Sequence, residues 1–179
     1  MTTSDFTATI VVDQTPKEAF TAINNVRGWW SEEIEGETDK LNEVFNYHFE
    51  DIHRCRIKVT ERVPDKKVVW HVLDNYFKPG IFDDPAHPAP SENGFDKTEW
   101  INTKIEFEIS KKDNKTQIRF THLGLVPEYE CFEVCSNGWT HYIHESLLSL
   151  IATGKGQPNS TDNPMTTDEE KFHSAAGNA

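Results

Sequence analysis

The chain has 179 residues and a mass of 20.6 kDa, which is the size of a single domain. Its 30 acidic side chains outnumber the 18 basic ones and give a formal net charge of -12. This charge argues against a general nucleic-acid or anionic-membrane binder, because both need a cationic surface. The apolar share is rich in rings, with 11 Phe, 5 Trp and 4 Tyr, so an aromatic core or pocket is expected.

Several segments that would assign a location are missing from the sequence. No apolar run approaches the length of about 18 residues that predicts a membrane-spanning helix. Residues 1–5 are uncharged apart from one acid and precede no apolar stretch of the kind that marks a secretory signal. Three cysteines are too few for a disulfide scaffold and fit a reducing compartment. These features favour a cytoplasmic protein with no membrane partner.

The first elements are a strand and a short helix. Apolar and polar residues alternate over 6–12, the pattern of a half-buried strand. Thr15 then offers an N-cap hydroxyl, Pro16 suits the first helical position, and Glu18 completes a capping box. The helix should end near Gly28. Its apolar stripe consists of Ala19, Phe20, Ile23 and Val26.

An antiparallel meander follows. Period-two alternation predicts strands over 45–49, 54–60, 68–73, 100–109 and 116–122. Turn-forming residues at 63–66 and 112–115 separate neighbouring strands and favour antiparallel pairing. The polar positions mix Lys, Arg and Glu, so one face of the sheet should face solvent.

The remaining segments are a long loop, a helix and a tail. An insertion at 75–96 is rich in proline and is expected to be a lid, a binding loop or a disordered excursion. Apolar residues at helical spacing predict a helix over 127–153, with a kink or break at Asn137 and Gly138. A polar tail over 155–179 is predicted to be disordered, so the domain should span 1–154.

Short motifs spread over residues 5–158 carry a family resemblance. They are TPKEAF at 15–20, GWW at 28–30, VP at 63–64, VVW at 68–70, THLGL at 121–125, GW at 138–139, SL at 146–147 and TGKGQP at 153–158. With the predicted element order, they resemble homologues of the C-terminal domain of the activator of the heat-shock-protein-90 ATPase, within the helix-grip, START-like (SRPBCC) superfamily. The resemblance implies an α+β helix-grip fold: a curved antiparallel sheet of about six or seven strands wrapped around a long C-terminal helix, with two short helices after the first strand.

The resemblance also implies a ligand cavity between the sheet and the helix, since members of the superfamily commonly hold a hydrophobic molecule there. The inward positions of the predicted strands and helix would line it. These candidate residues are Phe45, Tyr47, Phe49, Ile57, Trp70, Ile105, Phe107, Phe120, His122, Cys135, Trp139 and Tyr142. Aromatic residues also fill ordinary cores, so a closed core without a ligand stays open as an alternative.

His122 is the one candidate for catalysis, because its register places it inward beside Phe120. A buried imidazole can act as an acid or base, but it more often only hydrogen-bonds a backbone carbonyl. No nucleophile elbow, phosphate loop, zinc-protease motif or dinucleotide fingerprint is present, so no cofactor is expected.

A zinc site on the last helix is not expected either. Cys131, Cys135, His141 and His144 would point around a continuous helix rather than toward one ion. Only a break at 137–138 would bring them together.

Three functions remain open. The first is a binding module for a small, largely apolar, neutral or cationic molecule, with His122 and Tyr142 as its polar contacts. The second is an enzyme of the polyketide cyclase or hydrolase kind that uses the same cavity. The third is a chaperone-associated protein that binds its partner through the exposed sheet face.

Overall fold

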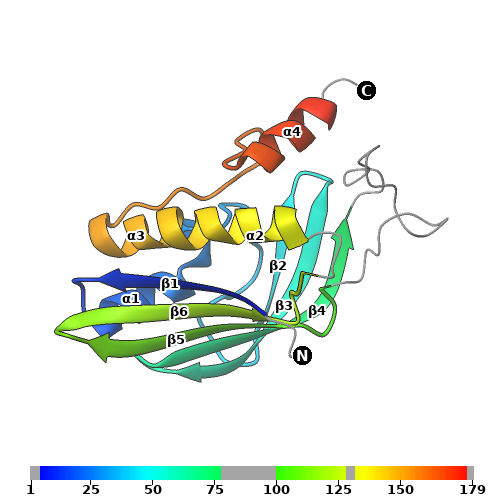
Figure 1. Ribbon diagram of the computed structural model, residues 1–179. Coiled ribbons are helices and arrows are strands. Elements are labelled where there is room, and N and C mark those ends of the chain that lie inside the picture. The colour runs from blue at the N-terminus through cyan, green and yellow to red at the C-terminus, as the bar shows by residue number, and fades with distance from the viewer. Residues whose placement is uncertain (1–4, 78–99, 128–131, 177–179) are drawn as a thin grey trace.

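The computed structural model describes residues 5–77, 100–127 and 132–176, and it confirms the predicted α+β architecture (Figure 1). Six antiparallel strands form one sheet in the order β1-β6-β5-β4-β3-β2. The strands are β1 (Phe6–Val12), β2 (Val44–Phe49), β3 (His53–Val63), β4 (Lys67–Phe77), β5 (Lys104–Lys112) and β6 (Lys115–Leu123). The helices are α1 (Pro16–Asn24), a 3-10 turn (Val26–Gly28), α2 (Phe132–His141), α3 (Leu148–Thr153) and α4 (Thr167–Ala176).

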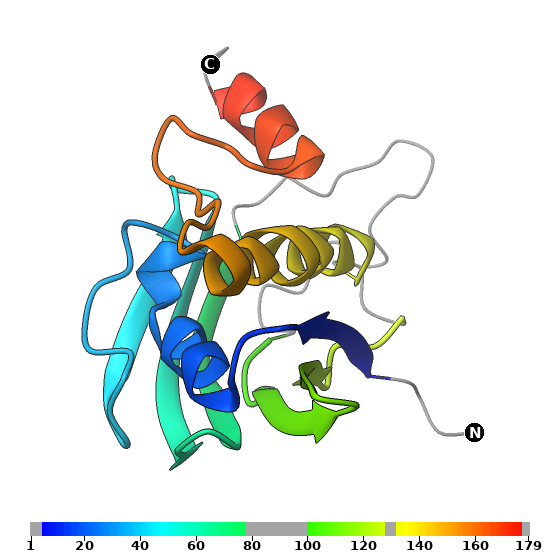
Figure 2. The same ribbon diagram turned by 90° about the vertical axis from the view of Figure 1, so that its left-hand side faces the viewer.

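The long helix formed by residues 132–153 lies across the concave face of the sheet. Figure 2 views this helix obliquely, with its α3 end toward the viewer, and shows the strands curving beneath and beside it. It runs through Asn137 and Gly138, where a break had been expected. The irregularity lies later, at the π-helical segment Tyr142–Leu147 between α2 and α3. Gly154 caps the C-terminal end of the helix in the left-handed conformation (φ 83°), which glycine adopts without steric cost.

Local signals at the N-terminal end are confirmed. Thr15 Oγ1 accepts from the backbone N–H of Glu18 at 3.2 Å, and Glu18 accepts from the backbone N–H of Thr15 at 2.7 Å. This capping box starts α1 and satisfies the backbone N–H groups of Thr15 and Glu18.

The fifth strand starts later than predicted. Residues 100–103 form a turn in which Thr103 donates to the Trp100 carbonyl from both its backbone N–H and its hydroxyl. Asn102 takes a positive φ of 67°, which no strand residue can adopt. The turn drives Trp100 into the core, and β5 begins at Lys104.

The C-terminal tail differs from the expectation of disorder. The backbone N–H of Asn159 donates to the Trp30 carbonyl at 3.0 Å, and the Asn159 carbonyl accepts from Glu32 at 2.9 Å. Asn159 is fully buried, and α4 follows it. Residues 155–176 are therefore ordered against the domain. The composition of the tail could not predict this order, because it depends on backbone hydrogen bonds of Asn159 with Trp30 and Glu32, which lie 129 and 127 residues earlier in the chain (159 minus 30 and 159 minus 32).

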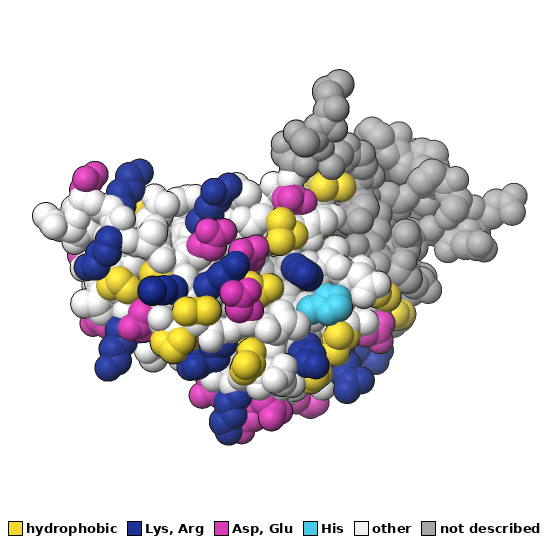
Figure 3. All heavy atoms as spheres, turned by 90° about the horizontal axis from the view of Figure 1, so that it is seen from below, with side chains coloured by type: hydrophobic (Ala, Val, Ile, Leu, Met, Phe, Trp, Pro, Cys, Tyr) yellow, Lys and Arg dark blue, Asp and Glu magenta, His cyan; other side chains and the backbone are white. Residues whose placement is uncertain are grey.

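The outer face of the sheet is polar, as the alternation predicted. Figure 3 shows Lys and Arg interspersed with Asp, Glu and single apolar side chains on this face. The chaperone-partner hypothesis placed on this face stays a prediction. Among the described residues, no helix has both the length and the apolar character needed to cross a membrane.

Candidate ligand cavity

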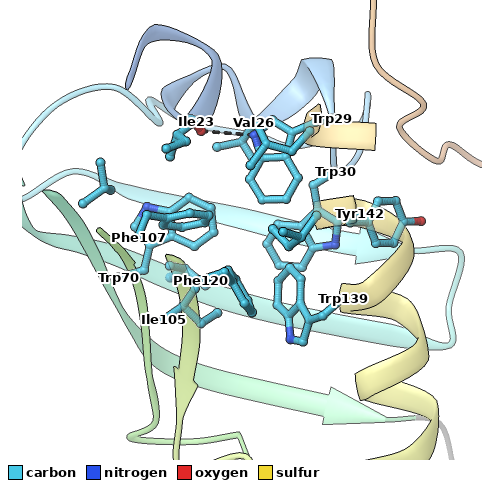
Figure 4. Packing of buried hydrophobic residues seen from close by; sticks show 14 of the residues in the cluster. Ile23, Val26, Trp29, Trp30, Trp70, Ile105, Phe107, Phe120, Trp139 and Tyr142 are labelled. Atoms are coloured by element: carbon cyan, nitrogen blue, oxygen red, sulfur yellow. Dashed lines mark hydrogen bonds between the residues drawn. The ribbon is translucent and has the colours of Figure 1, made fainter. Parts of the chain in front are cut away.

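The core between sheet and helix is solid at its centre. Trp70 on β4 is fully buried and stacks against Trp29 and Trp30, with ring centroids 6.2 and 6.1 Å apart and planes within about 10°. Phe45 and Phe107 meet Trp70 edge-on at 5.2 and 4.9 Å. Figure 4 shows how the two tryptophans that follow the 3-10 turn fill the space above the central strands.

A cavity of about 70 Å³ remains at one end of this core. It lies where the end of β2, the start of β3 and the end of β4 diverge from α2, toward the right-hand side of Figure 1. Aromatic rings make most of its wall: Trp30, Tyr47, Phe49, Phe77, Trp100 and Trp139. Further side chains and backbone come from Ile52, His53, Val134, Cys135, Gly138 and Tyr142. Thr166, Asp168 and Glu169 close it from the side of α4.

Five of the twelve residues predicted for a cavity line this one, namely Tyr47, Phe49, Cys135, Trp139 and Tyr142. The other seven pack in the solid part of the core, and they are Phe45, Ile57, Trp70, Ile105, Phe107, Phe120 and His122. Register correctly placed all twelve inward, but it could not show that Trp29 and Trp30 occupy the centre. The predicted lid at 75–96 lies outside the described residues except for 75–77, of which Phe77 lines the cavity.

His122 is held in a hydrogen-bonded chain. Trp139 donates its indole N–H to Nδ1 of His122 at 3.1 Å, so the imidazole proton resides on Nε2. Nε2 then donates to Thr103 Oγ1 at 2.8 Å, and that hydroxyl donates to the Trp100 carbonyl at 2.6 Å. Burial lowers the pKa of His122 to about 3, so the ring is neutral. With both ring nitrogens engaged, His122 anchors the helix and the 100–103 turn to β6.

A polar cluster borders the cavity on the side of α4. Tyr142 donates its hydroxyl to Glu169 at 2.6 Å. The Asn159 amide donates to the hydroxyls of Tyr142 at 2.7 Å and Tyr47 at 3.2 Å. The backbone N–H of Met165 donates to Glu169 at 2.9 Å. An acceptor, two hydroxyls and an amide thus meet beside an aromatic cavity.

The protonation equilibria of this cluster are shifted. Burial raises the pKa of the Glu169 carboxyl, although its hydrogen bonds from Tyr142 and Met165 act in the opposite direction. Burial also raises the pKa of the Tyr47 and Tyr142 hydroxyls, which therefore stay protonated. Sequence reasoning missed Glu169, because it lies in the tail that was expected to be disordered.

A second histidine belongs to the cavity wall. His53 lies against Phe77, with ring centroids 4.2 Å apart and planes 19° from parallel. Its Nε2 is 2.9 Å from Oδ1 of Asn75, and an amide oxygen can only accept, so Nε2 carries the proton. Burial lowers the pKa of His53 to about 4, so this ring is also neutral.

Three comparisons with known proteins were informative to different degrees. No sequence profile of a known family matches the chain, and no curated protein matches it. The chain is similar to the solved structure of the Aha1 dimer from Colwellia psychrerythraea, with 21% identity and a TM-score of 0.63 over 86% of this chain and 99% of that one.

Two further solved structures are similar to this chain. Protein SSP2350 from Staphylococcus saprophyticus has 12% identity and a TM-score of 0.56, over 88% of this chain and 98% of that one. DynU16, a protein in the dynemicin biosynthetic locus, has 12% identity and a TM-score of 0.55, over 84% of this chain and 48% of that one.

The chain has the START-like helix-grip fold. In this fold the long helix and the curved sheet enclose a space between them, and here a cluster of buried side chains that includes the stacked Trp29, Trp30 and Trp70 fills its centre. Of the cysteine–histidine set considered for zinc, Cys131 lies outside the described residues, Cys135 faces the cavity, and His141 contacts Glu145 at 2.8 Å.

Gly138 lies on α2 and lines the cavity. A Cβ atom added at Gly138 would meet no atom within 4 Å, so alanine fits without a clash. We expect Gly138→Ala to stabilise the protein by about 0.5–1 kcal/mol, because glycine is the more flexible residue in the unfolded chain. Urea unfolding of both proteins would measure this. A loss of stability would mean that the helix is packed more tightly here than the structure shows.

Proposed function

We propose that this protein binds a small, mainly apolar aromatic molecule in the cavity between β2–β4 and α2. The observation that carries the proposal is the combination of an aromatic wall with a polar cluster at one side. Apolar pockets with a few convergent polar groups are the usual way in which proteins hold small organic ligands. The rings supply contact area, and Glu169, Tyr142 and Asn159 supply orientation.

The size of the cavity limits the ligand. A volume of about 70 Å³ holds only a few water molecules, whereas a cavity that binds benzene measures about 150 Å³. A one- or two-ring molecule therefore needs the wall to move. The wall made by 166–169 is the best candidate, because this segment follows an extended stretch of chain and packs on the domain from one side only (Figures 1 and 2).

Charge further restricts the ligand. Glu169 is a largely buried carboxyl group, and the whole chain has a formal net charge of -12, so an anion would be repelled. A neutral molecule with an O–H or N–H group could replace Tyr142 as the donor to Glu169. Phenol, indole and 2-naphthol are suitable probes of this class.

The test uses a matched pair of helix variants. Gly138→Leu should fill the cavity, and Thr140→Leu adds a similar side chain on the exposed side of the same helix. At a free concentration of about 100 Kd, a probe should raise the Tm of the wild type and of Thr140→Leu by about 5–10 °C. Gly138→Leu should show no shift. No shift in the wild type, or an equal shift in Gly138→Leu, would exclude binding at this site.

A second function, acid–base catalysis in the same cavity, is favoured by one observation. Glu169 is a buried carboxyl with a raised pKa beside a tyrosine hydroxyl, and such groups are candidates for proton transfer. Glu169→Gln should abolish turnover of a cyclisable or hydrolysable substrate while probe binding persists. His122 is a weaker candidate than the sequence indicated, because both of its ring nitrogens are occupied.

A further inference from the structure

Three potential metal ligands meet beside α4, in a group that shares no residue with the polar cluster described above. They are Glu50 in the turn between β2 and β3, Asp162 in the segment before α4, and His173 on α4 itself. One ligand atom from each lies within 4.8 Å of the other two. Glu50 and His173 are 123 residues apart in sequence and are in direct contact through Oε1 and Nδ1. The fold therefore brings together ligands from three separate segments.

The charges of this group favour a cation. Two carboxylates at this separation repel each other, and a nearby positive charge would relieve the repulsion. Among the residues that the structure describes, no lysine or arginine forms an ion pair with Glu50 or Asp162. The Glu50 side chain is only 11% exposed, so solvent screens its charge poorly.

We propose that Glu50, Asp162 and His173 bind a divalent transition-metal cation of the Zn²⁺ class. Zn²⁺ takes one imidazole nitrogen at about 2.0–2.1 Å and carboxylate oxygens at about 2.0–2.2 Å, and it is commonly four-coordinate. Three protein ligands leave the fourth position to solvent, which the exposed Asp162 side makes accessible. A mixed imidazole and carboxylate set suits Zn²⁺ better than Mg²⁺ or Ca²⁺, which prefer oxygen ligands alone.

The position of this site on α4 determines how a bound cation would affect the structure. His173 lies one helical turn after Glu169 on α4, and Glu169 closes the cavity. A bound cation would tie α4 to the β2–β3 turn and so hold Glu169 beside Tyr142. The binding of the cation does not depend on the proposed aromatic ligand. Only its effect on cavity access rests on that proposed function.

The test titrates the full chain, freed of metal with a chelator, with Zn²⁺ by calorimetry and with Co²⁺ by visible absorption. We expect one ion per chain and a ligand-field spectrum for bound Co²⁺. His173→Ala and Glu50→Gln should each weaken binding at least about tenfold, because even the partner of a metal ligand contributes about 10- to 100-fold. His48→Ala is the matched control: His48 lies 3.5 Å from Glu33 in a separate histidine–glutamate pair, and its loss should leave the affinity unchanged.

Two results would overturn the proposal. One is the absence of a binding signal with the wild type, which would identify the group as a histidine–carboxylate ion pair. The other is equal affinity in the wild type and His173→Ala, which would place the ion elsewhere. Hydrogen exchange provides a second readout, since Zn²⁺ should slow exchange of the α4 amides in the wild type and not in His173→Ala. All of these measurements are made without an aromatic probe, so their failure leaves the proposed function standing.

Discussion

Trp70→Ala is expected to lower the free energy of unfolding by about 3–5 kcal/mol, the range for removing a buried tryptophan or phenylalanine side chain. Trp70 has no solvent exposure and is enclosed by Trp29, Trp30, Phe45 and Phe107. These rings come from a turn and two strands, so they cannot close in together on the space left behind. The unpaired indole N–H of Trp70 partly offsets the loss, because its removal relieves a buried donor with no partner in the described part of the chain.

Urea unfolding of Trp70→Ala and Leu41→Ala measures this effect against a matched surface site. Leu41 is 51% exposed, so its truncation should change stability by no more than about 0.5 kcal/mol. A loss of stability below about 1 kcal/mol in Trp70→Ala would show that the centre of the core between sheet and helix is hollow. The ligand would then belong at the centre, where the sequence had placed it, rather than at the end near α4.

Stability is also expected to fall by about 4 kcal/mol between pH 7 and pH 5 through two buried histidines. Burial lowers the pKa of His122 to about 3 and that of His53 to about 4, against about 6.5 in the unfolded chain. The unfolded state therefore takes up two protons below pH 6.5 that the folded state does not. Each proton costs about 2 kcal/mol of stability at pH 5. The stability is present above pH 6.5 and is lost as the pH falls toward the folded-state pKa values.

Glu169 changes the stability of the protein with pH in the opposite direction to the two histidines. Its folded-state pKa is raised, so the folded protein binds this proton at a higher pH than the unfolded chain and gains some stability as the pH falls.

The variant His122→Gln separates the contribution of His122 to this pH dependence from those of His53 and Glu169. The variant should be less stable at pH 7, because the hydrogen bonds with Trp139 and Thr103 are disturbed. Its loss between pH 7 and pH 5 should be smaller than that of the wild type by about 2 kcal/mol. Equal losses by urea unfolding at pH 7, 6 and 5 would mean that His122 is protonated in the folded protein.

The parts of the fold that depend on neighbouring residues were predictable. Alternation over 6–12 and 116–122 predicted the strands β1 and β6, although not their pairing with each other, and Thr15 with Glu18 predicted the start of α1. The inward register of His122 was also correct. These features are set by side-chain periodicity and by contacts three residues apart, which the sequence shows directly.

The position of the cavity was not predictable in the same way. It depends on the distance between sheet and helix at each end, and Trp29 and Trp30 decide this by filling the centre. Asn159 carries the other missing information. It is a polar residue in a polar tail. Its backbone N–H hydrogen-bonds to Trp30 and its side-chain amide hydrogen-bonds to Tyr142, and these two bonds order the chain that leads to Glu169. Composition cannot show such long-range hydrogen bonds.

A crystal structure with a brominated phenol or indole tests the central claim most directly, because the anomalous signal of bromine locates the probe independently of the protein. We predict a bromine peak between Trp30, Tyr47 and Trp139, with the O–H or N–H group of the probe near Glu169 and the α4 segment displaced from its position here. A bromine peak only on the outer face of the sheet, or none at a saturating concentration of probe, would contradict the proposed cavity.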